Sequence, residues 1–157
     1  MVDIEKFLDL TGYDTDIRRS RRKDKETNSQ EFFTPYSIIK RMCDKISEEE
    51  WSDPVKTFLE PCAGNGQFVC YIIWNRIQHG LTWRQAMNTL YALELMPDNV
   101  DEIKSRIKDL FKQMNIVYDN AELDIIMNTH IVCHDFFTWN FEKWRPMTDE
   151  ELKNKKK

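Results

Sequence analysis

The stretch Glu60-Pro61-Cys62-Ala63-Gly64-Asn65-Gly66 decides how this chain is expected to fold. The short segment 56–59 before it is typical of a strand, and a helical apolar pattern begins at about Gln67 and ends near Gly80. Glycine has no side chain to keep a ligand away from the backbone, so a turn with two glycines allows a close approach. The stretch therefore predicts a strand, a candidate binding turn and a helix.

The same alternation continues toward the C-terminus. Residues 90–95 and 130–134 are expected to form two further strands, and 82–89 a small helix. A long helix is predicted from Pro97 to about Met114, followed by an irregular stretch. Alternating strands and helices are typical of a parallel sheet with covering helices. We therefore expect an α/β fold whose parallel sheet has about three strands.

Helical and polar segments precede the glycine turn. Residues 1–13 carry a weak helical pattern, and 14–30 are polar throughout, which predicts a flexible arm. A helix is expected to begin at Thr34-Pro35, with the Thr34 side chain as its cap. The acidic stretch 47–53 is expected to be a connection. The buried face of the helix is expected to consist of Ile38, Ile39, Met42 and Ile46.

A carboxylate stands at the end of each of the three expected strands. Glu60, Glu94 and Asp135 therefore share one edge of the sheet, and ligands of parallel sheets bind at that edge. The turn lacks the Lys-Ser/Thr of a phosphate loop and the third glycine of a dinucleotide fingerprint, which favours a nucleoside without phosphate. In this interpretation Glu94 accepts hydrogen bonds from ribose hydroxyls, and Glu60 holds an ammonium group. Asp135 bonds the adenine amine, and Phe136 covers the ring.

Two segments resemble one family of enzymes. Residues 60–68, Glu-Pro-Cys-Ala-Gly-Asn-Gly-Gln-Phe, look like the S-adenosylmethionine-binding loop of amino-methylating DNA methyltransferases, especially adenine-specific ones. Gln30-Glu31-Phe32-Phe33-Thr34-Pro35 looks like the segment that precedes this loop and contacts the methionine end of the cofactor. The resemblance spans roughly residues 28–140 and implies a Rossmann-like methyltransferase fold, here truncated. It implies S-adenosylmethionine as the cofactor, bound by Phe33, Thr34, Glu60, Ala63, Gly64, Gly66, Glu94, Asp135 and Phe136.

The resemblance ends before the catalytic half of that family's fold. Adenine-specific members carry Asn/Asp-Pro-Pro-Tyr/Phe on a fourth strand, where the motif bonds the target amine and stacks on the flipped base. After Asp135 this chain reads Phe-Phe-Thr-Trp-Asn-Phe-Glu-Lys-Trp-Arg-Pro, which lacks the motif and leaves the catalytic residues unassigned. Three hypotheses follow. The chain serves methyl transfer to the exocyclic amine of a DNA base within an assembly, it is a non-catalytic module that binds the cofactor or a partner, or it cleaves the cofactor itself.

The missing strands carry a further expectation. In that family's sheet the first strand is central, so the loss of later strands leaves an open edge beside an uncovered apolar face. Open edges of this kind are prone to aggregation. We therefore expect the residues after Trp139, a second copy of this chain or another polypeptide to cover this edge.

Composition and charge narrow the remaining possibilities. The 157 residues suit one domain, and a net charge of −4 differs from that of a globally basic nucleic-acid coat protein. No apolar run is long enough to span a membrane, and four cysteines without regular spacing indicate reduced thiols, so we expect a cytoplasmic protein. Any DNA contact is expected from the basic arm, through Arg18, Arg19, Arg21 and Arg22.

The sequence predicts no metal site. On a strand, His130 and His134 face one side and Cys133 the other, and no fourth ligand is near. The expected organisation is an N-terminal helix with a basic arm, a cofactor-binding methyltransferase-like domain and a polar C-terminal tail that frays. These parts cover residues 1–30, 31–145 and 146–157.

Overall fold

The computed structural model describes residues 1–13 and 33–155. Within these ranges three strands form a parallel sheet in the order β1-β2-β3. Glu60 pairs with Ala92, and Glu94 with Cys133, so the carboxyl ends of the strands share one edge. The predicted α/β class and three-strand parallel sheet are confirmed. The strands are β1 (Phe58–Glu60), β2 (Leu90–Glu94) and β3 (Ile131–Cys133).

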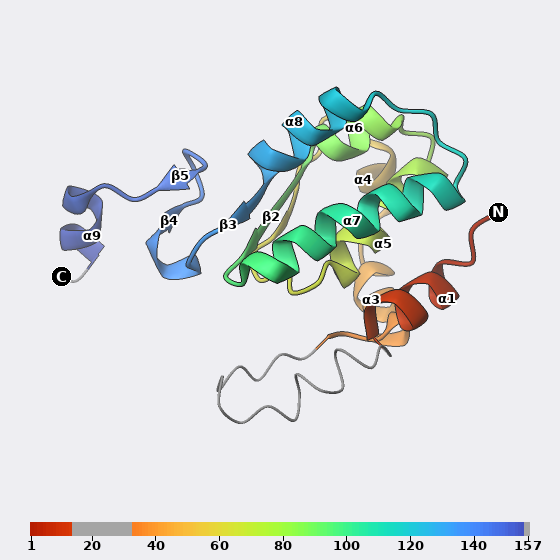
Figure 1. Cartoon of the computed structure of the whole chain (residues 1–157), viewed down its shortest axis with the longest axis horizontal. Coiled ribbons are helices and arrows are strands. Elements are labelled where there is room, and N and C mark those ends of the chain that lie inside the picture. The colour runs from red at the N-terminus through yellow and green to blue at the C-terminus, as the bar shows by residue number, and fades with distance from the viewer. Residues whose placement is uncertain (14–32, 156–157) are drawn as a thin grey trace.

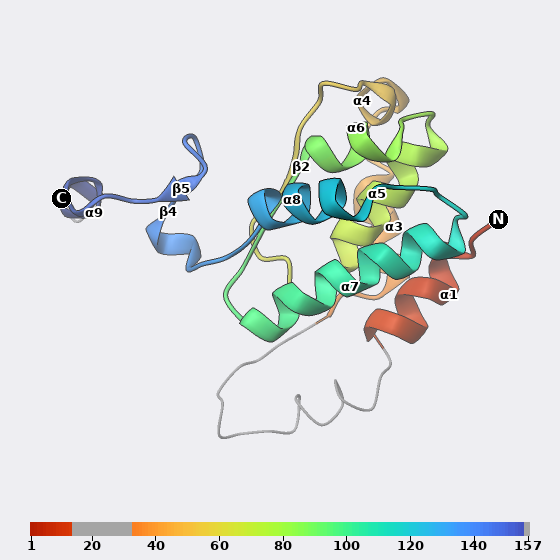
Figure 2. The same cartoon turned by 45° about the horizontal axis from the view of Figure 1, so that its top comes forward.

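Helices form most of the rest of the described chain (Figure 1). In Figures 1 and 2 the helices from α1 to α8 lie on one side of the sheet, and β4, β5 and α9 extend on the other. None of the described helices is long and apolar enough to cross a membrane. The elements are α1 (Ile4–Leu8), the π-helix η1 (Asp9–Tyr13), α3 (Tyr36–Cys43), α4 (Glu48–Ser52), α5 (Gln67–Gln78), α6 (Trp83–Asn88), α7 (Pro97–Gln113), α8 (Asn120–His130), the 3₁₀ helix η2 (Phe136–Thr138), the antiparallel strands β4 (Trp139–Asn140) and β5 (Arg145–Pro146), and α9 (Asp149–Lys155).

One face of the sheet packs against the helices. Leu90 and Ala92 alternate along β2 and enter the same core as Ile131 of β3. On the helical side, α7 presents a buried apolar stripe at three- and four-residue spacing, which is the period of a helix packed along one face. This stripe consists of Val100, Ile103, Ile107 and Leu110.

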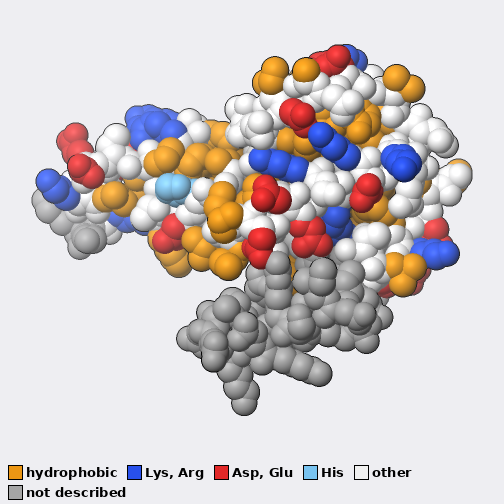
Figure 3. Space-filling model, viewed as in Figure 1, with side chains coloured by type: hydrophobic (Ala, Val, Ile, Leu, Met, Phe, Trp, Pro, Cys, Tyr) orange, Lys and Arg blue, Asp and Glu red, His pale blue; other side chains and the backbone are white. Residues whose placement is uncertain are grey.

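The C-terminal segment lies on the other face of the sheet. Leu59 pairs with Tyr91, and because strand side chains alternate, both lie on the face opposite Leu90 and Ala92. The ring of Trp144 meets that of Tyr91 edge-on at 4.9 Å, and its indole N–H donates to the Thr129 carbonyl at 2.8 Å. Figure 3 shows hydrophobic side chains gathered where this segment joins the body. The residues after Trp139 thus cover part of this apolar face.

A cleft of about 270 Å³ remains between β1 and the C-terminal turn. Its lining includes Leu59, Tyr91, Phe141 and Trp144, and Leu59 is 49% exposed. β1 lies at one end of the sheet, and no strand of the described residues pairs with its outer edge. Cover by a second copy of the chain or by another polypeptide stays a prediction.

Helix α3 differs from its predicted form. Ile39 and Cys43 are buried, whereas Ile38 and Met42 are exposed. The prediction that Ile38 and Met42 belong to the buried face is therefore wrong. The two pairs form adjacent i, i+4 stripes, and an eight-residue helix buries only the stripe that faces its neighbours.

The predicted cap of α3 is also wrong. Pro35 occupies the N-cap with extended backbone and makes no side-chain cap bond. The N–H of Tyr36 instead donates to the side chain of Asp9 at 3.1 Å. A carboxylate from a distant segment therefore satisfies a donor that Thr34 was expected to serve.

Two helices form where none was predicted. The acidic stretch 47–53 contains α4, which begins with a capping box between Ser47 and Glu50. The stretch expected to be irregular contains α8, whose N-cap Asp119 accepts from the N–H of Glu122 at 2.8 Å. The third strand consequently starts at Ile131, one residue later than predicted.

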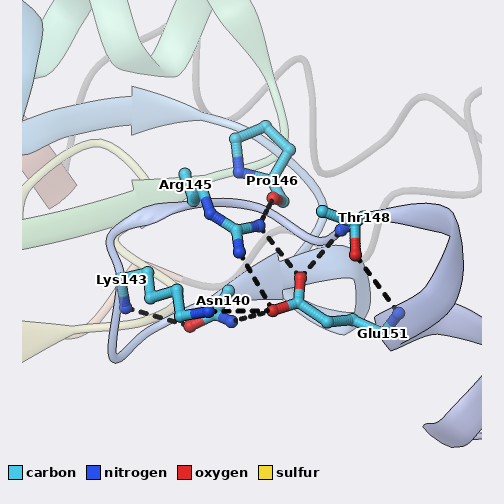
Figure 4. Close-up of polar contacts among 6 residues, drawn as sticks. All are labelled: Asn140, Lys143, Arg145, Pro146, Thr148 and Glu151. Carbon is cyan, nitrogen blue, oxygen red and sulfur yellow. Dashed lines mark hydrogen bonds and ion pairs between the residues drawn. The ribbon is translucent and has the colours of Figure 1, made fainter.

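The last part of the described chain is held by a polar network around Glu151 (Figure 4). Arg145 donates to both of its carboxylate oxygens, at 2.9 and 3.0 Å, and Asn140 donates at 2.9 Å. The Thr148 N–H adds a bond at 2.8 Å. The Arg145 bonds, helped by Thr148, lower the pKa of Glu151 to about 2. The fraying expected of the tail is thus replaced by α9 through Lys155.

Candidate functional site

The glycine turn is bonded to the end of β2. The Ala63 N–H donates to the Leu93 carbonyl at 2.9 Å, and the Gly64 N–H donates to Glu94 Oε2 at 2.6 Å. Glu94 Oε1 accepts from the Met96 N–H at 3.0 Å. The Glu94 carboxylate is therefore fixed between the turn and the start of α7. Each carboxylate oxygen has a second acceptor position, which can serve a hydroxyl group of a ligand.

Glu60 brings a second carboxylate to the same edge. Its Oε1 accepts from the Cys62 N–H at 3.2 Å. Burial raises the pKa of Glu60, the Cys62 bond opposes this, and the negative charge of Glu94 raises the pKa further. Two carboxylates that repel each other in a half-buried place favour a positively charged ligand, because a cation offsets both effects.

The backbone conformation favours glycine at both positions of the turn, and at Gly66 a neighbouring side chain requires it as well. Gly64 and Gly66 have φ values of +54° and +90°, in the left-handed region. A Cβ on Gly66 would lie 2.9 Å from Cγ1 of Ile103 in α7, and one on Gly64 would lie 3.4 Å from the Phe33 ring. The close approach that the sequence suggested for a ligand is, in this structure, an approach of protein side chains.

The segment at residues 33–34 lies against the turn. Phe33 is buried and packs over Gly64, and the Gln67 side-chain amide donates to the Thr34 carbonyl at 2.9 Å. The described part of this segment is therefore a neighbour of the glycine turn in space, although 25 residues lie between Thr34 and Glu60.

The end of β3 contributes a more exposed part of the edge. Asp135 caps the short helix η2, because its Oδ1 accepts from the Phe137 N–H at 2.9 Å. Phe136 is 39% exposed, and its ring lies 5.4 Å from that of Phe137 and 5.1 Å from that of Phe141. An exposed aromatic ring next to a carboxylate can cover and bond a flat heterocycle.

The structure thus gathers most of the predicted site residues and separates a few. Asp135 and Phe136 stand at the end of the neighbouring strand, β3, and Arg18, Arg19, Arg21 and Arg22 lie outside the described residues. Bonds, packing or charge link the others around the glycine turn: Phe33, Thr34, Glu60, Ala63, Gly64, Gly66 and Glu94.

Charge and ligand chemistry narrow what this edge can bind. The described part of the chain carries 15 Lys and Arg against 22 Asp and Glu side chains, so its surface is acidic. Nowhere in residues 1–13 and 33–155 do three His, Cys, Asp or Glu side chains gather as a metal site would require. The excess of negative charge on these residues favours a positively charged group at this edge.

Two residues that support the turn were not predicted from the sequence. Gln67 follows the turn directly, and Arg106 of α7 donates to the Asn65 carbonyl at 2.9 Å and to Gln67 Oε1 at 2.6 Å. The available signal was the position of Arg106, which falls on the buried stripe of α7 between Ile103 and Ile107. An arginine on an apolar stripe indicates a buried polar contact.

The chain matches no family model, no curated protein and no solved structure.

Proposed function

We propose that this chain binds S-adenosylmethionine at the carboxyl edge of its sheet. The observation that carries the proposal is the Glu94 carboxylate, held by the Gly64 N–H at 2.6 Å beside the raised-pKa carboxyl of Glu60. S-adenosylmethionine combines a ribose with two vicinal hydroxyls, an ammonium group and a sulfonium centre. The hydroxyls are hydrogen-bond donors for a carboxylate, and the two positively charged groups suit the negative charge of the glutamates.

Each part of the cofactor has a proposed partner. The free acceptor positions of Glu94 take the ribose hydroxyls, and Glu60 holds the ammonium group. Asp135 and Phe136 bond and cover the adenine. The segment at residues 33–34 borders the methionine end, an assignment that rests on its resemblance to the corresponding methyltransferase segment and on its packing over Gly64.

The chemistry that follows binding is proposed to need more than this chain. A parallel sheet with helices is compatible with a Rossmann-like fold. Methyl transfer requires the target amine in line with the sulfonium methyl, and the sequence lacks the motif that aligns it. We therefore propose a cofactor-binding protein of the DNA adenine methyltransferase type, with methyl transfer to a DNA base only in an assembly that holds the base.

Replacement of Glu94 tests the site. Glu94→Ala removes the ribose acceptor and the fixed point of the turn, and is expected to weaken S-adenosylmethionine binding about tenfold, or about 1.4 kcal/mol. Glu94→Gln keeps one acceptor oxygen, so its affinity for S-adenosylmethionine should lie between those of the natural chain and Glu94→Ala. Isothermal titration calorimetry measures the dissociation constants, with the exposed Glu122→Ala as a control that leaves them unchanged. The proposal would be refuted if Glu94→Ala bound the cofactor as tightly as the natural chain, or if the natural chain did not bind it.

The raised pKa of Glu60 predicts how binding depends on pH. The free protein holds the Glu60 proton above the ordinary carboxyl range, and a bound cation favours the ionised form, so binding releases a proton. The affinity should therefore rise as pH increases from about 4.3 through the raised Glu60 value, and then level off. The stability of the free protein should change in the opposite direction. Because the folded state holds this proton more tightly than the unfolded state, the contribution of Glu60 to stability falls as pH rises over the same range.

Glu60→Gln is the matching variant. It cannot ionise, so it should bind the cofactor more weakly, release no proton and lose the rise in affinity with pH. Titrations in two buffers of different ionisation enthalpy measure the proton release directly. A pH dependence that is unchanged in Glu60→Gln would assign it to another group.

A further inference from the structure

Arg106 is a buried cation with an unusual set of partners. Its side chain is 3% exposed, and burial lowers the pKa of Arg106. The guanidinium donates to the Asn65 carbonyl at 2.9 Å, to Gln67 Oε1 at 2.6 Å and to Thr11 Oγ1 at 3.3 Å. It also lies over the Phe7 ring at 5.6 Å.

Such a group is poorly explained by stability alone. Among the described residues its hydrogen-bond acceptors are all neutral and Arg106 Nε has none, so no close counter-charge there offsets the burial of this cation. An apolar side chain of similar size is often at least as stable in such a place. The two shortest bonds of Arg106 both go to the glycine turn and the residue after it, which suggests a role in setting that turn.

Gln67 passes this constraint on to the neighbouring segment. Because Arg106 has only donors, it fixes which end of the Gln67 amide faces it, namely the oxygen. The amide nitrogen must then face the opposite way, where it donates to the Thr34 carbonyl at 2.9 Å. Gln67 is itself buried, so this orientation is the one available to it.

We propose that Arg106 and Gln67 are positioning residues that hold the segment at residues 33–34 against the glycine turn and so set the affinity for the methionine end of the cofactor. This inference rests on the proposed function. Neither residue needs to touch the cofactor. Arg106 orients the Gln67 amide, Gln67 fixes Thr34, and the adenosine end of the site, at Glu94, is left unaffected.

Gln67→Glu separates the bond between Gln67 and Arg106 from the bond between Gln67 and Thr34. The new carboxylate still accepts from Arg106, but it has no N–H for the Thr34 carbonyl and repels it. The affinity for S-adenosylmethionine is expected to fall about tenfold, whereas that for adenosine, which lacks the methionine end, stays within about twofold. Calorimetric titration with both ligands measures this split. Gln67→Met, which loses both bonds, should show the same or a larger split.

A readout without ligand keeps this test apart from that of the proposed function. Amide hydrogen exchange at residues 33–34 should speed up in Gln67→Glu, while exchange in β1 and β2 stays unchanged. Equal losses for both ligands, or unchanged exchange at 33–34, would overturn the positioning role. If the natural chain bound neither ligand, the proposed function would be overturned, and with it the effect on the methionine end. Amide hydrogen exchange would still decide whether Arg106 and Gln67 position residues 33–34.

Discussion

Arg76→Ala is expected to destabilise the protein by about 3–5 kcal/mol, the largest effect of any substitution considered. Arg76 lies in α5 and is fully buried. Its guanidinium donates to the Lys56 carbonyl at 2.9 Å, to the Asp53 carbonyl and to the Thr89 hydroxyl. Alanine would leave a cavity and deprive these acceptors of their donor inside the protein. Urea unfolding followed by circular dichroism measures the change.

Arg84→Ala is the matched control for this prediction. Arg84 is 53% exposed on its side chain and pairs with Glu122 at 2.7 Å, so its removal should destabilise the protein far less than that of Arg76. Arg76→Lys keeps the charge but offers a single donor group, and its stability should fall between those of the natural protein and Arg76→Ala. Similar losses for Arg76→Ala and Arg84→Ala would show that the buried contacts of Arg76 contribute little.

The elements that could be predicted are those whose signal is local. The strand, glycine turn and helix around Gly64 follow from apolar residues next to a turn, and α7 from a long apolar stripe that begins at a proline. In α8, by contrast, Ile125, Ile126 and Thr129 are β-branched and disfavour a helix, and the run continues into β3. The helix forms because Leu123 and Met127 are buried on its packed side, and that packing is not visible in a short window of sequence.

The site shows the same division. Topology alone places Glu60, Glu94 and Asp135 at one edge, because parallel strands joined by right-handed crossovers end on the same side. The support of the turn could not be predicted in this way, since Arg106 reaches Gln67 across 39 residues of chain. The choice between the two apolar stripes of α3 likewise depends on neighbours that only the folded chain brings together.

Gly66→Ala is expected to destabilise the protein by about 2–4 kcal/mol, from backbone strain and overpacking together. Gly66 has a φ of +90°, and a Cβ there would lie 2.9 Å from Cγ1 of Ile103. Ile103 is fully buried, so it cannot turn away into solvent. The turn and α7 would have to move apart, and this shift should also disturb the bond from the Gly64 N–H to Glu94 and weaken cofactor binding. Urea unfolding and calorimetric titration measure the two effects.

Gly80→Ala isolates the part of this cost that comes from Ile103. Gly80 has a φ of +92°, but a Cβ there meets nothing within 4 Å, so only the backbone strain of about 1–2 kcal/mol remains. In the double variant Gly66→Ala with Ile103→Ala, the new methyl group occupies part of the space that isoleucine leaves, so the combined loss should be smaller than the sum of the single losses. Equal losses of stability in Gly66→Ala and Gly80→Ala would mean that α7 can move away from the turn at no measurable cost. Since packing by itself requires a glycine at 66, this residue cannot serve as evidence of a ligand, and the cofactor assignment depends on the carboxylates of Glu60 and Glu94.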